Sequence, residues 1–354
     1  MNIKLHSAEL SRMMKTMTQC IDPKSQNLGN IEIIYDNNLF SIRGTNGQIS
    51  AVMSAPVLGG NGESFCIDGT MFARVCAMCN DIVDVSTDGK VCTVKGAGRT
   101  RIPIVKAKIP AFEYVEGKTC TVKTEDFRAG YNSVSYAISS DQGRVVLTGV
   151  LMESTDDGMR MVSLDGFRMA VEDVACESDD IRMVVPGAFM KLVATSTLLG
   201  ERITLKTDGK RIQASTDSVL MSCTLLSDDF PDYKRILPTE FKTESLVEVD
   251  DIQNALKCGS VVNTSNNLVK MEVQEDAIKV MSNSEQADFD ADVKCATNGD
   301  SLKIAFNHKY LMETIASVSE KSMTMKFNSS VSPCVIQGKS SNGCRLILPV
   351  RVAG

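Results

Sequence analysis

The sequence lacks any apolar run approaching the roughly 18 residues that a membrane-spanning helix needs, and it has no low-complexity tract. The N-terminal stretch MNIKLHSAELSRMM has no apolar h-region and is typical of a strand followed by a helix, so no signal peptide is expected. With 43% apolar residues over 354 positions, the chain predicts a globular, cytoplasmic protein of two or three domains.

Histidine is scarce, and the familiar phosphate-binding motifs are missing. His6 and His308 are the only histidines, and neither lies in a plausible catalytic triad context. No GxGxxG or P-loop motif occurs. The glycine-rich stretch KGAGRTR from Lys95 lacks the trailing glycine and lysine that these phosphate-binding motifs need. An enzyme that uses Asp165, Arg168 or Cys76 is therefore disfavoured. The sequence predicts neither catalysis nor a cofactor.

An excess of basic residues is also missing. The formal charge is −6 and the pI is about 5.2, which argues against a protein that grips nucleic acid by overall electrostatic attraction. A locally basic surface remains compatible with this charge.

Twelve cysteines are scattered over the chain, and without an export signal they favour reduced, buried thiols over a disulfide framework. Only Cys76 and Cys79 have the CxxC spacing of a metal or redox site. They lie in a helical pattern with no second such pair, so structural thiols are expected and no metal site is predicted.

A unit of about 120 residues repeats three times. Amphipathic helical patterns begin at residues 7, 124 and 249, and a second family begins at 68, 186 and 307. Alternating strand-like segments fill the intervals, and polar turns occupy matching places in TNGQ, LDGF and SNSE. The spacing predicts three tandem domains, at residues 1–119, 120–243 and 244–354.

Each unit is therefore predicted to run strand, helix, hairpin strands, helix, hairpin strands. Two helices cannot cover both faces of so many strands, so the expected class is α+β, with antiparallel sheets and a helix pair packed on one side. Tandem copies arranged head to tail either continue as an open filament or close into a ring.

The stretch SLDGFRMAV, residues 163–171, places a charge among apolar residues after an Asp-Gly turn. Strand alternation predicts Phe167 and Met169 on one face, with Arg168 and Ala170 on the other. By itself, the pattern leaves Arg168 open as a solvated charge, a catalytic cation or part of a docking surface.

Several stretches closely resemble the bacterial DNA polymerase III beta sliding clamp: RVVLTGVLMES (144–154), SLDGFRMAV, DDFPDYKRILP (228–238), FNHKYLMETI (306–315) and the C-terminal LILPVRV. The resemblance runs through all three repeats and is strongest in the second and third. It implies three similar domains per chain and a head-to-tail homodimer that closes as a six-domain ring. Double-stranded DNA would thread the ring without sequence preference, and the clamp would hold polymerase on the template without catalysing a reaction.

The resemblance also implies a hydrophobic pocket between the second and third domains, which captures short linear peptides from the polymerase III catalytic subunit, the clamp loader and other replication and repair proteins. Here the methionines found in some members are replaced by Leu348 and Val350, which predicts a drier, less adaptable pocket. The residues carried over by motif are Leu147, Leu164, Gly166, Phe167, Arg168, Met169, Pro231, Arg235, Ile236, Tyr310, Leu346, Leu348, Pro349, Val350 and Arg351.

The six helical segments together carry as many basic as acidic residues, so the whole negative charge lies outside them. Basic helix residues are candidates to face phosphates across water, although ordinary solvated charges explain each one equally well. The candidate DNA-binding residues are Arg12, Lys15, Arg74, Arg128, Lys191 and Lys257, together with Lys24 and Arg144 from the resemblance.

Ring closure, on the same resemblance, would join the first domain of one chain to the third domain of another. The candidate contacts are Arg101, Ile102 and Ile104 on one side and Val261 and Val262 on the other, and burial within each domain is an equally good explanation. The alternative function is a repeat scaffold that binds linear peptides without encircling DNA, and it differs from the clamp only in closure.

Overall fold

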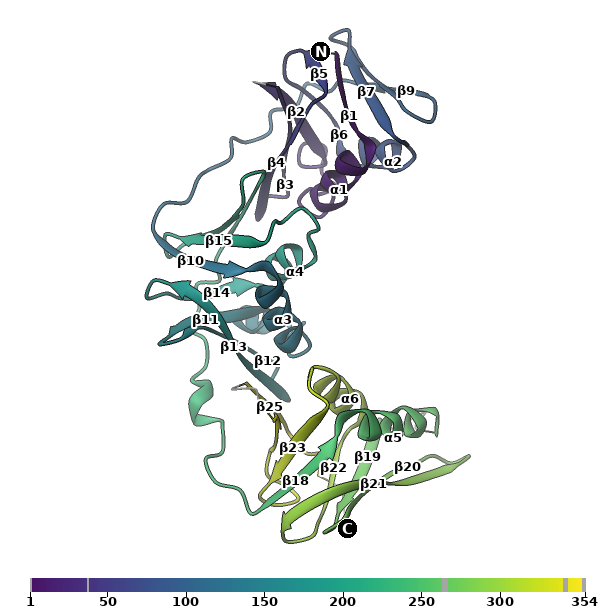
Figure 1. Ribbon diagram of the computed structural model, residues 1–354, viewed down its shortest axis with the longest axis vertical. Coiled ribbons are helices and arrows are strands. Elements are labelled where there is room, and N and C mark those ends of the chain that lie inside the picture. Colours follow the sequence, from purple (N-terminus) through teal and green to yellow (C-terminus); the bar gives the residue numbers. More distant parts are fainter. Residues whose placement is uncertain (1, 37, 263–266, 340–342, 352–354) are drawn as a thin grey trace. The chain divides into compact units, whose positions relative to one another are not determined.

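A computed structural model describes residues 2–36, 38–262, 267–339 and 343–351 (Figure 1). Val352 of the LILPVRV stretch lies outside the described residues. The predicted element order is confirmed three times over, and all six predicted helices form within the predicted segments. Among the described residues, no helix is long and apolar enough to cross a membrane.

The elements of each repeat follow the same order. The first repeat contains β1 (Asn2–His6), α1 (Ser7–Met17), β2 (Asn30–Asp36), β3 (Leu39–Thr45), β4 (Ile49–Pro56), β5 (Gly59–Asn61), β6 (Phe65–Asp68), α2 (Gly69–Ala77), β7 (Ile82–Thr87), β8 (Val91–Lys95) and β9 (Arg99–Pro103). The second contains β10 (Lys118–Lys123), α3 (Thr124–Ser135), the 3-10 helix η1 (Gln142–Thr148), β11 (Gly149–Thr155), β12 (Gly158–Leu164), β13 (Arg168–Ser178), β14 (Arg182–Pro186), α4 (Gly187–Thr195), β15 (Arg202–Thr207), β16 (Arg211–Ser215) and β17 (Val219–Thr224). After the 3-10 helix η2 (Tyr233–Arg235), the third contains β18 (Thr243–Glu248), α5 (Val249–Val262), β19 (Leu268–Val273), β20 (Ala277–Asn283), β21 (Asp288–Gly299), β22 (Leu302–Asn307), α6 (His308–Ala316), β23 (Ser322–Phe327), β24 (Cys334–Gly338) and β25 (Cys344–Ile347).

The second helix of each repeat begins at a local signal in the sequence. The Asp68 side chain accepts a hydrogen bond from the Met71 amide at 2.6 Å, and the Asn307 side chain does the same for the Tyr310 amide at 3.1 Å. These N-caps satisfy amides that have no partner within the helix. In the second repeat Pro186 takes the capping position, where its fixed φ suits the entry to a helix.

Contacts divide the chain into two compact units, each described here by itself. Unit 1 comprises residues 1–128 and 176–226, and unit 2 comprises residues 129–175 and 227–354. Unit 1 contains the antiparallel sheets β5-β1-β7-β8-β9 and β6-β2-β3-β4-β17-β16-β15-β10. Unit 2 contains β11-β12-β13-β25-β24-β23-β18-β21 and β21-β20-β19-β22.

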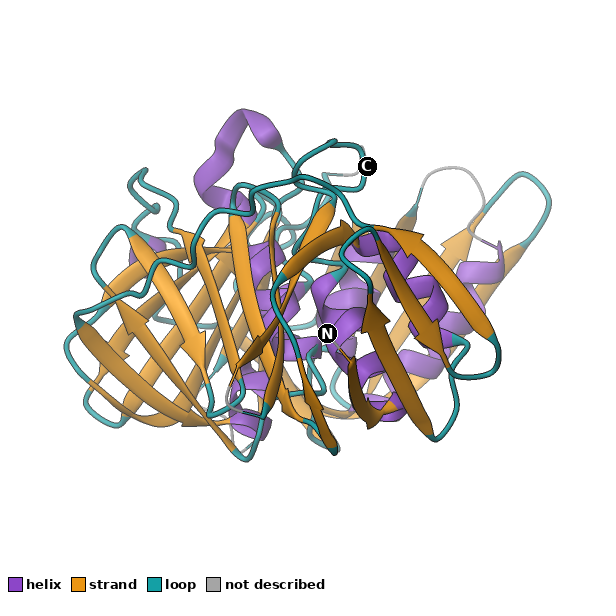
Figure 2. Ribbon diagram, turned by 90° about the horizontal axis from the view of Figure 1, so that it is seen from above, coloured by secondary structure: helices purple, strands orange, loops and turns teal. Residues whose placement is uncertain are grey.

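Helix pairs pack beside these sheets, as Figure 2 shows. In the first repeat α1 contacts α2 and the strands β3 and β4, and in the third repeat α5 contacts α6 together with β20 and β21 (Figure 1). The alternation of side chains along the strands explains why a helix pair covers one face of a sheet. In β18 the residues alternate strictly between buried and exposed, so that one face lies in the apolar core.

One sheet in each unit joins strands from consecutive repeats. The first junction pairs β4 with β17 in unit 1, and the second junction pairs β13 with β25 in unit 2. The two registers correspond, because Ile49 lies opposite Cys223 just as Arg168 lies opposite Ile347. The same geometry therefore occurs twice in the chain with different side chains.

Candidate functional site

The turn between β12 and β13 presents Phe167 to solvent. A carboxylate oxygen of Asp165 accepts hydrogen bonds from the amides of Phe167 and Arg168, both at 2.8 Å, and Gly166 has φ +92°. An Asx turn followed by a left-handed glycine is the local chemistry that an Asp-Gly pair favours. The Phe167 side chain is 56% exposed.

The alternation expected across this turn was wrong at Phe167. The strand begins at Arg168, so Phe167 belongs to the turn and is exposed, whereas Met169 is buried. Period-two alternation holds only where the backbone is extended.

Arg168 is 7% exposed, and its guanidinium group is fully engaged within the chain. Nε bonds to Asp165 at 3.1 Å, Nη1 pairs with Glu313 of α6, and Nη2 donates to the Tyr136 carbonyl at 2.8 Å. The guanidinium carbon also lies 4.2 Å from the ring centroid of Tyr310. The side chain is neither a solvated charge nor a free cation; it fixes the turn and α6 to one another.

The C-terminal strand brings further apolar residues to the same place. The Leu348 amide donates to the Phe167 carbonyl at 2.9 Å, and the Phe167 and Tyr310 rings lie 5.8 Å apart. The Val350 amide donates to the Ala305 carbonyl at 2.8 Å, which holds the segment after β25 in place. We call Phe167, Tyr310, Leu348 and Val350 the apolar cluster.

The other residues expected in the pocket divide by exposure. One group is buried, and a second group is exposed or half-buried, including Arg235, whose side chain is paired with Asp232 at 2.9 Å. The buried residues are Leu147, Leu164, Met169 and Leu346, and the more exposed ones are Gly166, Pro231, Arg235, Ile236, Pro349 and Arg351.

The segment that carries Pro231 and Ile236 is held by Tyr233. The Tyr233 hydroxyl donates to Glu153 of β11, and burial followed by this hydrogen bond raises the pKa of Tyr233 to about 12. Arg160 lies in the same network and bonds Asp173 at 2.7 and 2.8 Å. A hydroxyl that stays protonated is a steady donor, so the segment is anchored to the sheet of unit 2.

The first junction has the same turn but a different surface. Its turn has Gly47 at φ +91°, with Gln48 at the place of Phe167 and the buried Ile49 at the place of Arg168. The position of Tyr310 is taken by Phe189, which is 1% exposed. Of the two junctions, as far as the structure describes them, only the second combines exposed apolar side chains with the ion pairs of a buried arginine.

The candidate DNA-binding residues do not form one group. Arg128 donates to the Ala194 and Ser196 carbonyls at 3.0 and 2.6 Å, so it caps the end of α4, and Arg12 donates to the Thr197 carbonyl. A guanidinium nitrogen of Arg144 lies 3.7 Å from where a Cβ on Gly166 would stand, which puts Arg144 beside the turn between β12 and β13. The exposed remainder comprises Lys15, Lys24, Arg74, Lys191 and Lys257.

The candidate ring-closure residues also differ in exposure. Ile102 is 3% exposed and lies in the sheet of the first repeat, whereas Arg101 is exposed, Ile104 is half-buried, and Val261 at the end of α5 is 78% exposed. Val262 is half-buried.

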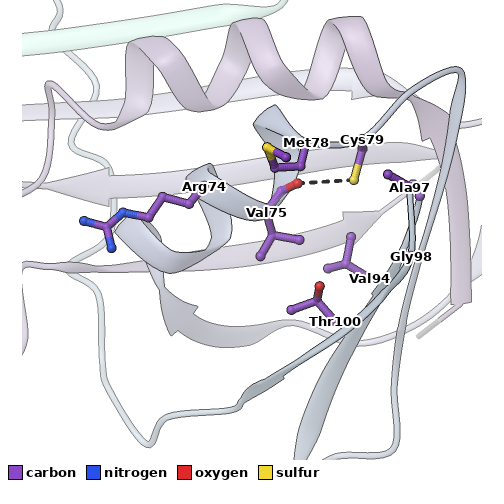
Figure 3. A pocket seen from close by; sticks show the side chains of 9 residues that line it. Arg74, Val75, Met78, Cys79, Val94, Ala97, Gly98 and Thr100 are labelled. Atoms are coloured by element: carbon purple, nitrogen blue, oxygen red, sulfur yellow. Dashed lines mark hydrogen bonds between the residues drawn. The ribbon is translucent and has the colours of Figure 1, made fainter.

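A pocket of about 190 Å³ lies between α2 and the β8–β9 hairpin (Figure 3). Arg74, Val75 and Met78 line it from the helix, and Val94 and Thr100 line it from the strands. A second cavity of about 560 Å³ includes Met71 and Ile102 on the other side of Arg74. Sequence reasoning missed Met71 and Met78, which are 46% and 72% exposed, because their helical spacing is also that of core residues.

The cysteines are all free thiols in the structure. Burial raises the pKa of Cys76 far above its usual range, so its thiol stays protonated. The described residues contain no group of three or more His, Cys, Asp or Glu side chains that could hold a metal ion.

Residues 121–232 match the central domain of the DNA polymerase III beta subunit, and residues 234–351 match its C-terminal domain. The beta sliding clamp of Streptomyces coelicolor is 27% identical over 308 residues, covering 81% of this chain and 82% of that protein, and the beta sliding clamp of Pseudomonas putida is 22% identical over 92% of each.

The fold likeness extends to the first repeat. The crystal structure of the DNA polymerase III beta subunit from Thermotoga maritima superimposes with a TM-score of 0.93 at 23% identity, covering 99% of this chain and all of the other. A Pseudomonas aeruginosa sliding clamp bound to griselimycin superimposes with a TM-score of 0.93 at 18% identity and 99% coverage of this chain.

Three repeats of one helix-and-sheet unit, with an exposed apolar cluster at one junction, define a sliding clamp. The two family matches together span more than half of the sequence. The chain belongs to the DNA polymerase III beta-subunit family.

Proposed function

We propose that two copies of this chain close head to tail into a ring around double-stranded DNA, and that the apolar cluster tethers polymerase to the ring without catalysing any reaction. The domains that would form the ring are residues 1–119, 120–243 and 244–354. The observation that carries the tethering part of the proposal is the contrast between the two junctions, because exposed Phe167 and half-buried Tyr310 at one are replaced by Gln48 and a buried Phe189 at the other.

A linear peptide suits the apolar cluster. Exposed aromatic and aliphatic side chains over a buried floor take apolar anchor residues, and a short extended segment is the usual ligand of such a surface. Leu348 and Val350 are stiffer than methionine, so we expect a narrower choice of anchor side chains. The partners would be the polymerase III catalytic subunit, the clamp loader and other replication and repair proteins in the cytoplasm.

Contact with DNA would be weak and independent of sequence. Lys15, Arg74, Lys191 and Lys257 are exposed helix residues that can face phosphates through water, whereas Arg128 is committed to carbonyl groups at the end of α4. Neutral helices in an acidic protein make no strong electrostatic grip, so threading rather than affinity would hold the clamp on DNA.

Complementary charge and exposed apolar side chains support ring closure by a second copy. In unit 1 the surface around the α2 pockets carries exposed Arg99 and Arg101 beside apolar Met71 and Met78. In unit 2 the strand β21 carries exposed Asp288, Asp290 and Asp292, and α5 ends with the exposed Val261. These two surfaces are suited to pairing, because one is basic, the other is acidic, and each has exposed apolar side chains beside the charges.

The test of encirclement uses a nicked circular plasmid. A clamp loader places the labelled protein on the circle, free protein is removed by gel filtration, and a restriction enzyme then cuts half of the sample. We expect retention on the circle and loss from the linear product, with little dependence on DNA sequence. Equal retention on both would show that the protein is held by affinity.

Native mass spectrometry separates the clamp from the non-encircling scaffold. The ring predicts a dimer of twice 38.4 kDa at micromolar concentration. A monomer that still binds the polymerase peptide would favour the scaffold, which the comparisons do not support.

A further inference from the structure

Two cysteines lie in contact on neighbouring strands of unit 1, apart from the surfaces described above. The Cys120 thiol on β10 donates a hydrogen bond to the Cys176 sulfur near the end of β13, with the two sulfur atoms 3.4 Å apart. The strands pair antiparallel in this region, with Cys120 opposite Ser178 and Val122 opposite Cys176. The two residues are 56 positions apart, so the fold alone brings them together.

We propose that Cys120 and Cys176 form a thiol oxidation site, at which a peroxide converts the pair into a reversible disulfide. Disulfide formation requires the sulfur atoms to close from 3.4 Å to about 2.05 Å, a movement that side-chain rotation and a small backbone shift can supply. The pairing between β10 and β13 extends over three residue pairs and continues in the hydrogen bond from the Asp179 amide to the Thr119 carbonyl at 2.9 Å, so the two strands hold the thiols side by side.

The surroundings of the two thiols indicate which one reacts with the peroxide first. Cys176 is half-buried, and the hydrogen bond from Cys120 lowers the pKa of its thiol. Cys120 is 1% exposed, and the same hydrogen bond together with burial raises the pKa of its thiol. The thiolate is the form that attacks peroxide, so Cys176 is the residue that reacts first and Cys120 is the resolving thiol.

The reaction balances in two steps. The Cys176 thiolate attacks one oxygen of hydrogen peroxide, the O–O bond breaks, and hydroxide leaves, so that Cys176 is oxidised to a sulfenic acid and the peroxide is reduced. Cys120 sulfur then attacks Cys176 sulfur, the S–O bond breaks, and the Cys120 proton leaves with the hydroxide as water. A small thiol reductant reverses the product to two thiols.

The test uses the full-length reduced protein treated with hydrogen peroxide, followed by alkylation of free thiols, digestion without reduction and mass spectrometry. We expect a linked peptide pair containing Cys120 and Cys176, and a fall in free thiols from twelve to ten, which dithiothreitol restores. The oxidised protein should also unfold at a higher temperature than the reduced protein, because the cross-link restricts the unfolded chain.

Two variants separate the roles, and a third serves as the control. Cys120→Ser should leave a Cys176 sulfenic acid that dimedone traps, and Cys176→Ser should give neither the adduct nor the linked pair. Cys258→Ser removes an exposed thiol on α5 and should leave the linked pair unchanged. A first disulfide between other cysteines, such as Cys76 and Cys79, would overturn the proposal. So would the absence of the linked pair after exposed thiols have been oxidised.

Discussion

Replacing Arg168 with alanine tests whether the buried charge network supports the docking surface. The change leaves Asp165, at 12% side-chain exposure, without its buried ion pair, and it leaves Glu313, at 38%, with its 4.0 Å ion pair to Lys309. Breaking a buried ion pair by removing one partner costs about 3–5 kcal/mol. Because water can reach Glu313, we expect the lower end, about 3 kcal/mol off the free energy of unfolding.

The same substitution should weaken peptide binding. Arg168 lies over the Tyr310 ring, and Tyr310 in turn contacts Phe167, so two members of the apolar cluster lose their support. Loss of well-packed aromatic anchors costs a peptide interface about 1 kcal/mol or more, and ~1.4 kcal/mol corresponds to tenfold in affinity. We expect about a tenfold loss, measured by fluorescence polarisation with a labelled polymerase peptide.

Leu348→Ala provides the matched comparison. Leu348 is 38% exposed, so its truncation should change the unfolding free energy by less than about 1 kcal/mol while still weakening the peptide. Urea denaturation followed by circular dichroism measures both variants. If Leu348→Ala lowered the free energy of unfolding as much as Arg168→Ala does, Leu348 would belong to the hydrophobic core rather than to a docking surface.

The first junction supplies a rescue variant for the same experiment. Ile49 and Leu192 stand at the positions that correspond to Arg168 and Glu313, and both are buried. The double variant Arg168→Ile with Glu313→Leu should therefore recover part of the stability, because well-packed apolar residues often replace a buried ion pair without loss. Unfolding of Arg168→Ala within about 0.5 kcal/mol of the parent would refute the assignment of the network as a support.

Three further predictions concern other regions. Burial lowers the pKa of His308 from its usual 6.5, and its Nε2 lies 2.9 Å from the Leu256 carbonyl. The unfolded chain therefore binds the proton more readily, so the free energy of unfolding falls as the pH drops below 6.5. The variant His308→Gln should make the free energy of unfolding, measured by urea titration, depend less on pH. Asp68→Ala removes the N-cap of α2 and should cost about 1 kcal/mol in urea denaturation, whereas no change would show that the cap is replaced by water. Val261→Asp, at a side chain 78% exposed, should shift native mass spectra from dimer to monomer while the far-ultraviolet circular dichroism stays unchanged, and a persisting dimer would contradict the proposed closure surface.

Much of the fold could be predicted from local sequence patterns. Helices at Ser7, Thr124 and Val249 were expected from apolar residues three and four apart, and the repeats reinforce one another because one structural unit satisfies the same pattern three times. The Asp165-Gly166 turn was equally readable, since an aspartate followed by glycine favours this backbone conformation.

The site could be predicted in part. Motif resemblance named Phe167, Tyr310 and Leu348 as members of one surface, and it remains a prediction that they bind a peptide. The exposure of individual side chains could not be predicted from the sequence. Met78, at the C-terminal end of α2, has the spacing of a core residue and yet is 72% exposed.

Only the tertiary structure decided which partners the charged and sulfur-bearing side chains meet. Arg168 and Glu313 are 145 residues apart, Arg128 reaches carbonyl groups at the end of α4, and Cys120 meets Cys176 across two strands. A periodic sequence predicts which face of a helix or strand is buried, because the direction of each side chain follows from the backbone geometry. It does not state what covers that side, since such contacts join residues distant along the chain and depend on how all the elements pack together.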